Sequence, residues 1–397
     1  MAEAAREVWI TGIGIVSCLG EGPEAHWQKL MAAQPSADET TLAPFVVHPL
    51  APINFDTQIP KKGDQRQMEP WQRIGTYAAG LALDSAGVKG KPDILSHMDM
   101  IVAAGGGERD LTVDSTILSG IAGAADPGAY LNERLMSDLR PTLFLAQLSN
   151  LLAGNISIVH GVTGSSRTFM GEESAGIDAV RVAFARIVAG QSDIALVGGS
   201  YNGERPDSIM FFEFAGMALK DRLLPVWERK GKGGVALGSI GAFLVLEARG
   251  HAEARGAKPL AKLSAVVSDR SKRAAGDVTA ALTRLWDKIK DKIATGHAAT
   301  LSGAAGGAPA TGEERAFLEA HGDLAVRATG SYLGHGPEPQ FPMNIALAAI
   351  ALDHASLFPP CDTSGLERPM SGDLRQVVVT GVGHWRGEGL ALIEKAG

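Results

Sequence analysis

The chain has 397 residues, of which 45% are hydrophobic and 20% are charged, so it can bury a large core and is not a disordered polymer. Its 37 basic and 44 acidic side chains give a net charge of −7, which offers no electrostatic reason to expect a nucleic-acid partner. Its apolar runs fall short of the ~20 residues of a membrane span, and its two cysteines are too few for a disulfide framework or a zinc cluster.

Short β-branched runs alternate with helical patterns along the chain, which predicts an α/β fold with buried strands. The first strand is expected at residues 8–15, directly after the polar residues 1–7, which leaves no room for a signal peptide. Together with the few cysteines, this favours a reducing, cytoplasmic location. Further strands are expected at residues 100–104, 156–160, 194–197, 241–246, 263–267 and 377–380.

Two helices follow from apolar residues at helical spacing. One is expected from Asp277, as N-cap, to Ile293, and the other carries Ile177 and Ile187 on one face and ends near Gly190. Residues 35–73 are rich in Pro, Gln and charge and indicate an insertion between elements. The polar stretch 252–258 is the expected boundary between two units, residues 1–251 and 252–397.

Residues 167–178 combine an extended run, a glycine and a helix that begins near Glu173. Free backbone N–H groups and the helix dipole favour an anion at such a helix start, where enzymes of this geometry place a nucleophile. The alternative is that Glu172 and Glu173 are ordinary acids in the first turn of a helix.

Histidines are mostly structural, but His335 follows a glycine in a loop ahead of the apolar helix 343–352. His384 lies in the Gly-rich turn 381–389, which resembles a GxGxxG fingerprint only loosely and precedes a strand, so no dinucleotide site is expected there.

Basic residues cluster in three short stretches of the chain. They could dock an acidic carrier protein, or they could be solvated turns. These clusters are residues 61–62, 229–232 and 270–273.

Several segments, in the same order along nearly the whole chain, resemble β-ketoacyl-acyl-carrier-protein synthases of the type II, elongating class. Residues 6–17 resemble the opening strand of that family, 151–161 the strand that leads to the active site, and 190–199 the strand after the nucleophile helix. Residues 234–238 and the pair 334–335 extend the match. The resemblance implies the thiolase fold, with two similar halves in an α/β/α/β/α sandwich and usually a dimer.

The chemistry of this family uses a cysteine that accepts the acyl chain and two histidines that polarise the malonyl thioester. The resemblance places Glu173 at the cysteine position and Gly303 at the first histidine, and it retains His335 as the second. The family lysine corresponds to Gly330, whereas the acid that orients this lysine is kept as Glu314.

Neither cysteine is placed to substitute for the nucleophile. Cys18 falls in the turn after the first strand, and Cys361 falls in a late Pro-rich loop. Condensation by the isolated chain is therefore not expected.

The family's gating loop corresponds to residues 383–387. Trp385 would take the place of the gate aromatic, its N–H would form half of the oxyanion hole, and the bulky His384 and Arg386 would restrict the loop. By the same resemblance, Thr142, Leu143 and Phe144 would line the acyl tunnel at the dimer interface. The small Thr142 suggests a longer tunnel for long chains, such as those of lipid A.

Two main functions follow from the resemblance. The first is a partner subunit, similar to chain-length factors, that forms a heterodimer with a Cys-containing ketosynthase in fatty-acid or polyketide elongation. The second is a malonyl-carrier decarboxylase that supplies primer. A weakly active condensing enzyme and a generic acyl-binding scaffold are further alternatives, and a homodimer is the alternative to the heterodimer. The partner would be acyl carrier protein or an acyl thioester, and no metal or organic cofactor is implied.

Overall fold

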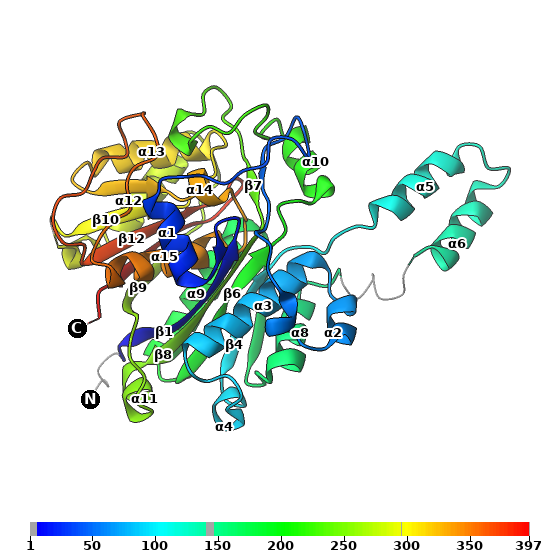
Figure 1. The fold of residues 1–397 in the computed structure, drawn as a ribbon. Helices are drawn as coiled ribbons and strands as arrows, with labels where there is room; N and C mark the ends of the chain where they lie inside the picture. The colour runs from blue at the N-terminus through cyan, green and yellow to red at the C-terminus, as the bar shows by residue number, and fades with distance from the viewer. Residues whose placement is uncertain (1–5, 140–146, 295, 397) are drawn as a thin grey trace.

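The computed structural model describes residues 6–139, 147–294 and 296–396 of the chain, shown in Figure 1. Its eleven-stranded sheet has the strand order β11-β10-β12-β13-β9-β1-β8-β6-β4-β5, with β2 paired to β1. The strands are β1 Val8–Ser17, β2 Gly20–Glu21, β4 Asp99–Ala104, β5 Ser166–Met170, β6 Ile194–Tyr201, β8 Ile240–Ala248, β9 Ala261–Asp269, β10 Ala298–Ser302, β11 Ala325–Ala328, β12 Gln376–Val382 and β13 Glu388–Glu394. A separate parallel pair is formed by β3 Val47–His48 and β7 Leu237–Gly238.

The sheet consists of two halves with one topology. The five long strands of each half can be numbered in chain order. From the outer edge of the sheet inward, both halves then have the order third, second, fourth, fifth, first, which places β1 and β9 at the junction. These two strands pair antiparallel over three residues, Val8 to Ile10 with Leu263 to Ala261. The duplicated fold expected from the resemblance is therefore present, while the boundary at residues 251 and 252 stays a prediction.

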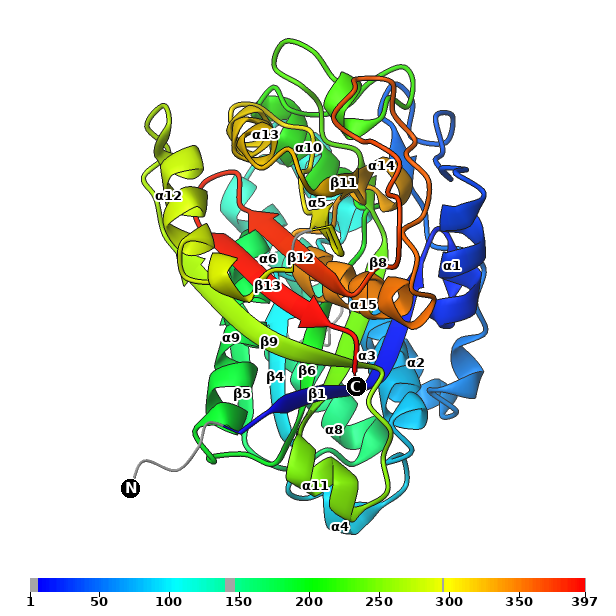
Figure 2. The same cartoon turned by 90° about the vertical axis from the view of Figure 1, so that its left-hand side faces the viewer.

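Helices cover both faces of the sheet and fill the space between its halves (Figure 2). Helices α3 and α8 pack outside the first half, and α12 and α13 lie outside the second. The helices are α1 Gly22–Met31, α2 Lys62–Gln67, α3 Pro70–Ser85, α4 Pro92–Leu95, α5 Leu111–Ile121, α6 Pro127–Ser137, α8 Leu151–His160, α9 Glu172–Val188, α10 Pro206–Phe214, α11 Arg249–Ala254, α12 Asp277–Trp286, α13 Ala310–Ala320, α14 Gly330–Leu333 and α15 Gln340–Asp353.

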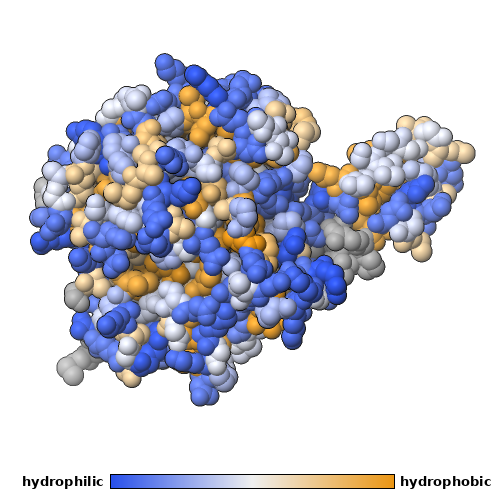
Figure 3. Space-filling model, viewed as in Figure 1, coloured by the Kyte–Doolittle hydropathy of each residue, from blue (hydrophilic) through white to orange (hydrophobic). Residues whose placement is uncertain are grey.

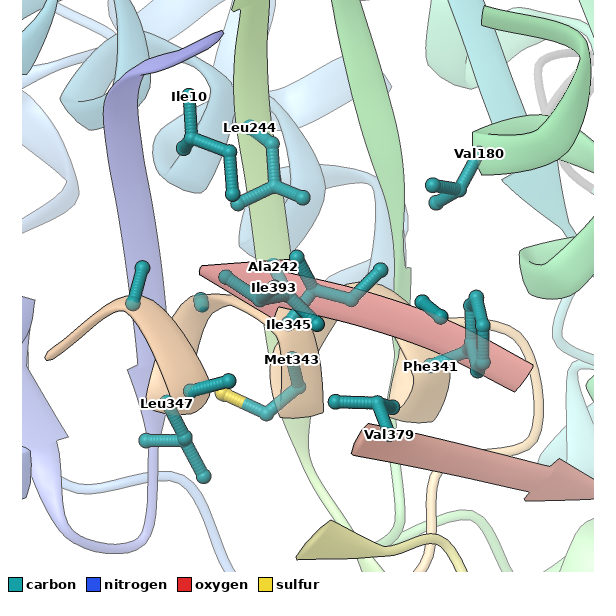
Figure 4. Close-up of a cluster of buried hydrophobic side chains, with 14 of the residues drawn as sticks. Ile10, Val180, Ala242, Leu244, Phe341, Met343, Ile345, Leu347, Val379 and Ile393 are labelled. Atoms are coloured by element: carbon teal, nitrogen blue, oxygen red, sulfur yellow. The ribbon is translucent and has the colours of Figure 1, made fainter. Parts of the chain in front are cut away.

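The central layer is formed by α9 and α15, which contact strands of both halves. Helix α15 is buried on every side from Gln340 to Leu352, as expected for a helix that is apolar all round. Its Phe341, Met343 and Ile345 pack against strand residues of both halves in the cluster of Figure 4. The layers therefore form an α/β/α/β/α sandwich. The loops that adjoin its middle layer carry the site described below.

Helices α5 and α6 form an arm that projects from the body of the protein (Figures 1 and 3). The two helices pack against each other, and several of their apolar side chains face solvent. Leu118 and Met136 are 72% and 79% exposed, respectively.

Two expectations about local structure are wrong. Residues 156–160, which we expected as a strand leading to the site, belong to helix α8, because Leu152, Ala153 and Ile156 bury one helical face against the first half of the sheet. The strand that leads to α9 is β5 instead. The helix expected over residues 277–293 ends at Trp286, and its N-cap is Gly276.

No helix in the described part of the chain is long and apolar enough to cross a bilayer.

Candidate active site

The site begins where β5 leads into α9. Gly171, with φ of 102°, is the N-cap of α9, and Glu172 takes a positive φ of 58°, so the chain turns sharply before the first helical turn. This turn directs Glu173 into the interior, where its side chain is only 4% exposed. The unpaired N–H groups and the dipole of a helix start favour a carboxylate at this place.

Glu173 is bonded to His335, a residue 162 positions later in the chain. His335 lies in the loop between α14 and α15, and its Nε2 is 2.8 Å from Oε1 of Glu173. Both side chains are buried. The histidine and the acid predicted as site residues are thus brought together by the middle layer of the fold.

The pKa of the Glu173 carboxyl reflects two opposing influences. Burial acts to raise it, but the hydrogen bond from His335 and the electrostatic effect of the nearby imidazoles of His335 and His384 outweigh burial, and the pKa is lowered. Glu173 is therefore a carboxylate at neutral pH, with the Nε2–H of His335 as its donor.

A second imidazole comes from the turn between β12 and β13. The ring centroid of His384 lies 6.0 Å from that of His335, and burial lowers the pKa of His384 to about 4. One donor atom from each of Glu173, His335 and His384 lies within 4.8 Å of the others. The sequence placed His384 in the Gly-rich turn and in the gate loop, but it did not predict this grouping with Glu173 and His335.

Gly303 follows β10, where the resemblance expects the other histidine. Its backbone N–H donates to Oγ1 of Thr380 at 3.2 Å. A Cβ atom at this position would lie 2.7 Å from the carbonyl oxygen of Thr380, so the backbone of β12 leaves no room for a side chain. His384 is therefore the imidazole that accompanies His335 in this structure.

Glu314, on α13, lies buried near the same strands. It accepts hydrogen bonds from Oγ of Ser302, at 2.7 Å, and from Oγ1 of Thr380. Burial raises the pKa of this carboxyl, and the two hydroxyls only partly counter that effect. Gly330, which the resemblance matches to the family lysine, lies at the start of α14 and has no side chain to pair with this acid.

Another buried acid, Glu338, was not identified from the sequence. Burial raises its pKa to about 8, against a weaker lowering by a backbone hydrogen bond, and the charge of Glu173 adds to the rise. A Cβ added at Gly105 would lie 2.5 Å from Oε1 of Glu338, and one at Gly176 would lie 2.3 Å from its backbone oxygen. Gly176 thus lets α9 approach this loop, and Glu338 fills the space at the end of β4. The only sequence signal was an acid between two prolines after His335.

The turn that carries His384 is held by Arg273 and by an aromatic contact of Trp385. Arg273 donates to the backbone oxygens of Gly383 and Gly387 and pairs with Glu388. Trp385, which is 39% exposed, lies with its ring centroid 5.2 Å from that of Phe211 on α10. The indole is placed on an aromatic surface, and its predicted part in an oxyanion hole stays a prediction.

The basic cluster at residues 270–273 serves largely internal contacts. Arg273 holds the turn, Arg270 pairs with Asp178, and the half-buried Arg229 of the second cluster donates to backbone carbonyls. Lys230 and Lys232 are exposed. These contacts favour the structural interpretation for the arginines.

Both cysteines are poor nucleophiles. Sγ of Cys18 lies 3.3 Å from the backbone oxygen of Tyr332, and burial raises the pKa of this thiol to about 12. Burial raises the pKa of Cys361 to about 12 as well. Both side chains are therefore protonated thiols at neutral pH.

The proposed tunnel residues Thr142, Leu143 and Phe144 lie outside the described residues.

Residues 5–251 match the family described as Beta-ketoacyl synthase, N-terminal domain. Over 283 residues the chain is 28% identical to 3-oxoacyl-acyl-carrier-protein synthase 2 of Rhizobium meliloti (strain 1021), a match that covers 65% of this chain and 63% of that relative. The chain thus spans less than two thirds of that protein's length.

Solved structures share the fold over nearly the whole chain. The structure titled "The ishigamide ketosynthase/chain length factor" has a TM-score of 0.80 at 20% identity and covers 99% of this chain and 100% of its own. A type II PKS acyl-carrier protein in complex with its ketosynthase bound to the hexaketide has a TM-score of 0.73 at 17% identity, with the same coverage. At these identities the likeness shows the thiolase fold of the ketosynthases.

Proposed function

Because the chain belongs to the beta-ketoacyl synthase family, we propose that it is the chain-length-determining partner of a Cys-containing ketosynthase. In this proposal the partner subunit performs the condensation, and this chain completes the dimer and helps to shape the acyl tunnel. The acyl chain is a polyketide or a fatty acid carried by acyl carrier protein.

The hydrogen bond between Glu173 and His335 is the observation that carries the proposal. A condensing enzyme needs a thiolate to accept the acyl group and imidazole N–H groups to stabilise the developing enolate. Here a carboxylate, a poor acyl acceptor, accepts the hydrogen bond from the retained imidazole. The negative charge of Glu173 would also oppose an enolate in the same place.

Missing hydrogen-bond donors to the oxyanion make the expected loss of condensation rate larger. Removal of a single oxyanion donor typically lowers a rate by ~10²–10³, and Gly303 contributes no side chain at the first histidine position. Both thiols are protonated, so neither is a substitute nucleophile. These features support a subunit without condensing activity of its own.

The surface of the first half suits a partner subunit. Strand β5 ends the sheet, and in the described part of the chain no strand pairs with its outer edge. Met170 on this strand is 65% exposed, and the arm formed by α5 and α6 presents Leu118 and Met136 to solvent. An open strand edge beside apolar side chains is normally covered in a native assembly. A ketosynthase of the same fold, with the same edge, is the partner that we propose for this surface.

A malonyl-carrier decarboxylase is the second candidate, and His384 is the observation that favours it. Decarboxylation needs no nucleophile, only donors to the thioester carbonyl. His384 is neutral at neutral pH, and its Nε2 is buried with no hydrogen-bond partner in the described part of the protein. The charge on Glu173 argues against this candidate.

One set of reactions separates the candidates. The purified chain, a Cys-containing ketosynthase from the same source and their co-purified complex are each incubated with malonyl-carrier and acyl-carrier, and carrier-bound products are identified by mass spectrometry. We expect elongation only by the complex, with loss of activity when the ketosynthase cysteine is changed to alanine. A Glu173→Gln change in this chain should leave elongation intact.

Other outcomes would replace the proposal. Acetyl-carrier formed by the chain alone, and lost in His384→Ala but retained in the matched variant His97→Ala, would establish the decarboxylase. Elongation by the chain alone would show a condensing enzyme. Failure of the chain to co-purify with any ketosynthase, together with a stable homodimer, would remove the partner function.

A further inference from the structure

Glu173, His335 and His384 form a buried cluster of one carboxylate and two imidazoles. These three donors come from the start of α9, the loop before α15 and the turn after β12. We propose that this cluster binds a divalent transition-metal ion of the zinc class. The proposal concerns the site itself and does not depend on the partner function.

The donor types and their spacing fit such an ion. Zinc is bound by histidine nitrogens and carboxylate oxygens at about 2.0–2.2 Å, which sets neighbouring donors of a tetrahedral site roughly 3.3 Å apart. In the structure Nε2 of His335 and Oε1 of Glu173 are 2.8 Å apart, and the three donors lie within 4.8 Å of one another. Small side-chain movements therefore bring all three donors to a common ion.

The cluster also holds polar atoms that lack partners. Oε2 of Glu173 and Nε2 of His384 are buried, and neither has a hydrogen-bond partner in the described part of the chain. Buried polar atoms are nearly always satisfied, and an unpartnered one is a recognised sign of an ion or water that the site can take. Two such atoms in one cluster give it free coordination capacity.

The ion would have a structural effect. It would tie α9 and the loop before α15 to the turn at residues 383–387, which Arg273 also holds. Three protein donors leave one position of a tetrahedral ion open, which a water molecule can fill.

The test uses the full-length chain with the metal alone. The protein is stripped with EDTA, loaded with Zn²⁺, freed of unbound metal by gel filtration and analysed for zinc by mass spectrometry. We expect about one zinc per chain. Loss of a residue that only supports a metal ligand already weakens metal binding by ~10–100-fold. Because His384→Ala and Glu173→Gln each remove a ligand, both variants should lose nearly all of the zinc. His97→Ala, which removes an exposed histidine on the surface, is the matched control and should retain the zinc.

Wild-type protein gives a second, independent measurement. X-ray absorption of the zinc-loaded chain should show nitrogen and oxygen ligands without sulfur, whether or not the variants fold. Sulfur in the first shell would move the metal to Cys18, whose Sγ lies 3.8 Å from Nδ1 of His48, and would overturn the proposal. Absence of retained zinc, or equal zinc in wild type and His384→Ala, would overturn it too.

Discussion

Two buried glutamates, Glu173 on α9 and Glu314 on α13, have opposite pKa shifts although both are enclosed by the same sandwich. Glu173 meets an imidazole, and its pKa is lowered, whereas Glu314 meets two hydroxyls, and its pKa is raised. Burial is common to both, so the hydrogen-bond donors decide the direction of the shift. We call the surroundings of Glu173 the charged cluster and those of Glu314 the neutral pocket, after the imidazole and hydroxyl donors around each acid.

The largest effect should come from removing the imidazole of the charged cluster. His335→Leu leaves the Glu173 carboxylate buried without its donor, which typically destabilises a protein by about 3–5 kcal/mol. Urea unfolding at neutral pH measures the change. The double variant Glu173→Leu with His335→Leu should recover most of the stability, because an apolar pair of similar volume carries no buried charge. A double variant as unstable as His335→Leu would show that packing, not charge, dominates there.

Gly303→His would introduce the residue type that the family resemblance predicts for that position. We expect a loss of about 1–3 kcal/mol, typical of overpacking, because the backbone oxygen of Thr380 occupies the space of the new Cβ. Thermal unfolding measures this, with Gly312→Ala on the open surface of α13 as control. Wild-type stability in Gly303→His would mean that β12 moves aside easily.

The neutral pocket should be less sensitive than the charged cluster. Thr380→Val keeps the shape of the side chain but removes the hydroxyl that donates to Glu314 and accepts from the backbone of Gly303. A net loss of about 1–2 kcal/mol is expected for these hydrogen bonds. If urea unfolding shows a loss as large as that of His335→Leu, the two regions do not differ as described.

The smallest changes should be in pH dependence, with opposite signs. The lowered pKa of Glu173 gives stability that is present above its ordinary value of 4.5 and is lost as the pH falls through the folded value. The raised pKa of Glu314 means that the unfolded chain ionises first, so stability falls as the pH rises above 4.5.

Unfolding curves from acid to neutral pH test this difference. Glu173→Gln should reduce the loss of stability at acid pH. Glu314→Gln should become more stable relative to the wild type as the pH rises. Equal responses of the two variants would contradict the assignment of charge to the two acids.

Much of the fold could be predicted from the sequence, because strands such as β1 and β12 are β-branched runs bounded by glycines. The family resemblance and the duplicated α/β architecture are confirmed. Helix α8 was mistaken for a strand because a ten-residue apolar run satisfies both patterns, and only its packing against α3 decides between them.

The site could be predicted only in part. Glu173 and His335 were singled out by a helix start and a Gly-His pair, and the family resemblance then assigned them to the site. The approach of His384 depends on the β12–β13 turn folding back over α9, and the burial of Glu338 depends on space left by Gly105. Such contacts join segments far apart in the chain, and no local pattern encodes them.

The arm formed by α5 and α6 has a practical consequence for anyone who handles this protein. Its exposed leucines and Met136 would be in contact with water whenever the chain is alone, and such surfaces tend to associate with one another. Expressed by itself, the chain should therefore aggregate or recruit chaperones, and co-production with the ketosynthase that we propose as its partner should improve the yield of soluble material.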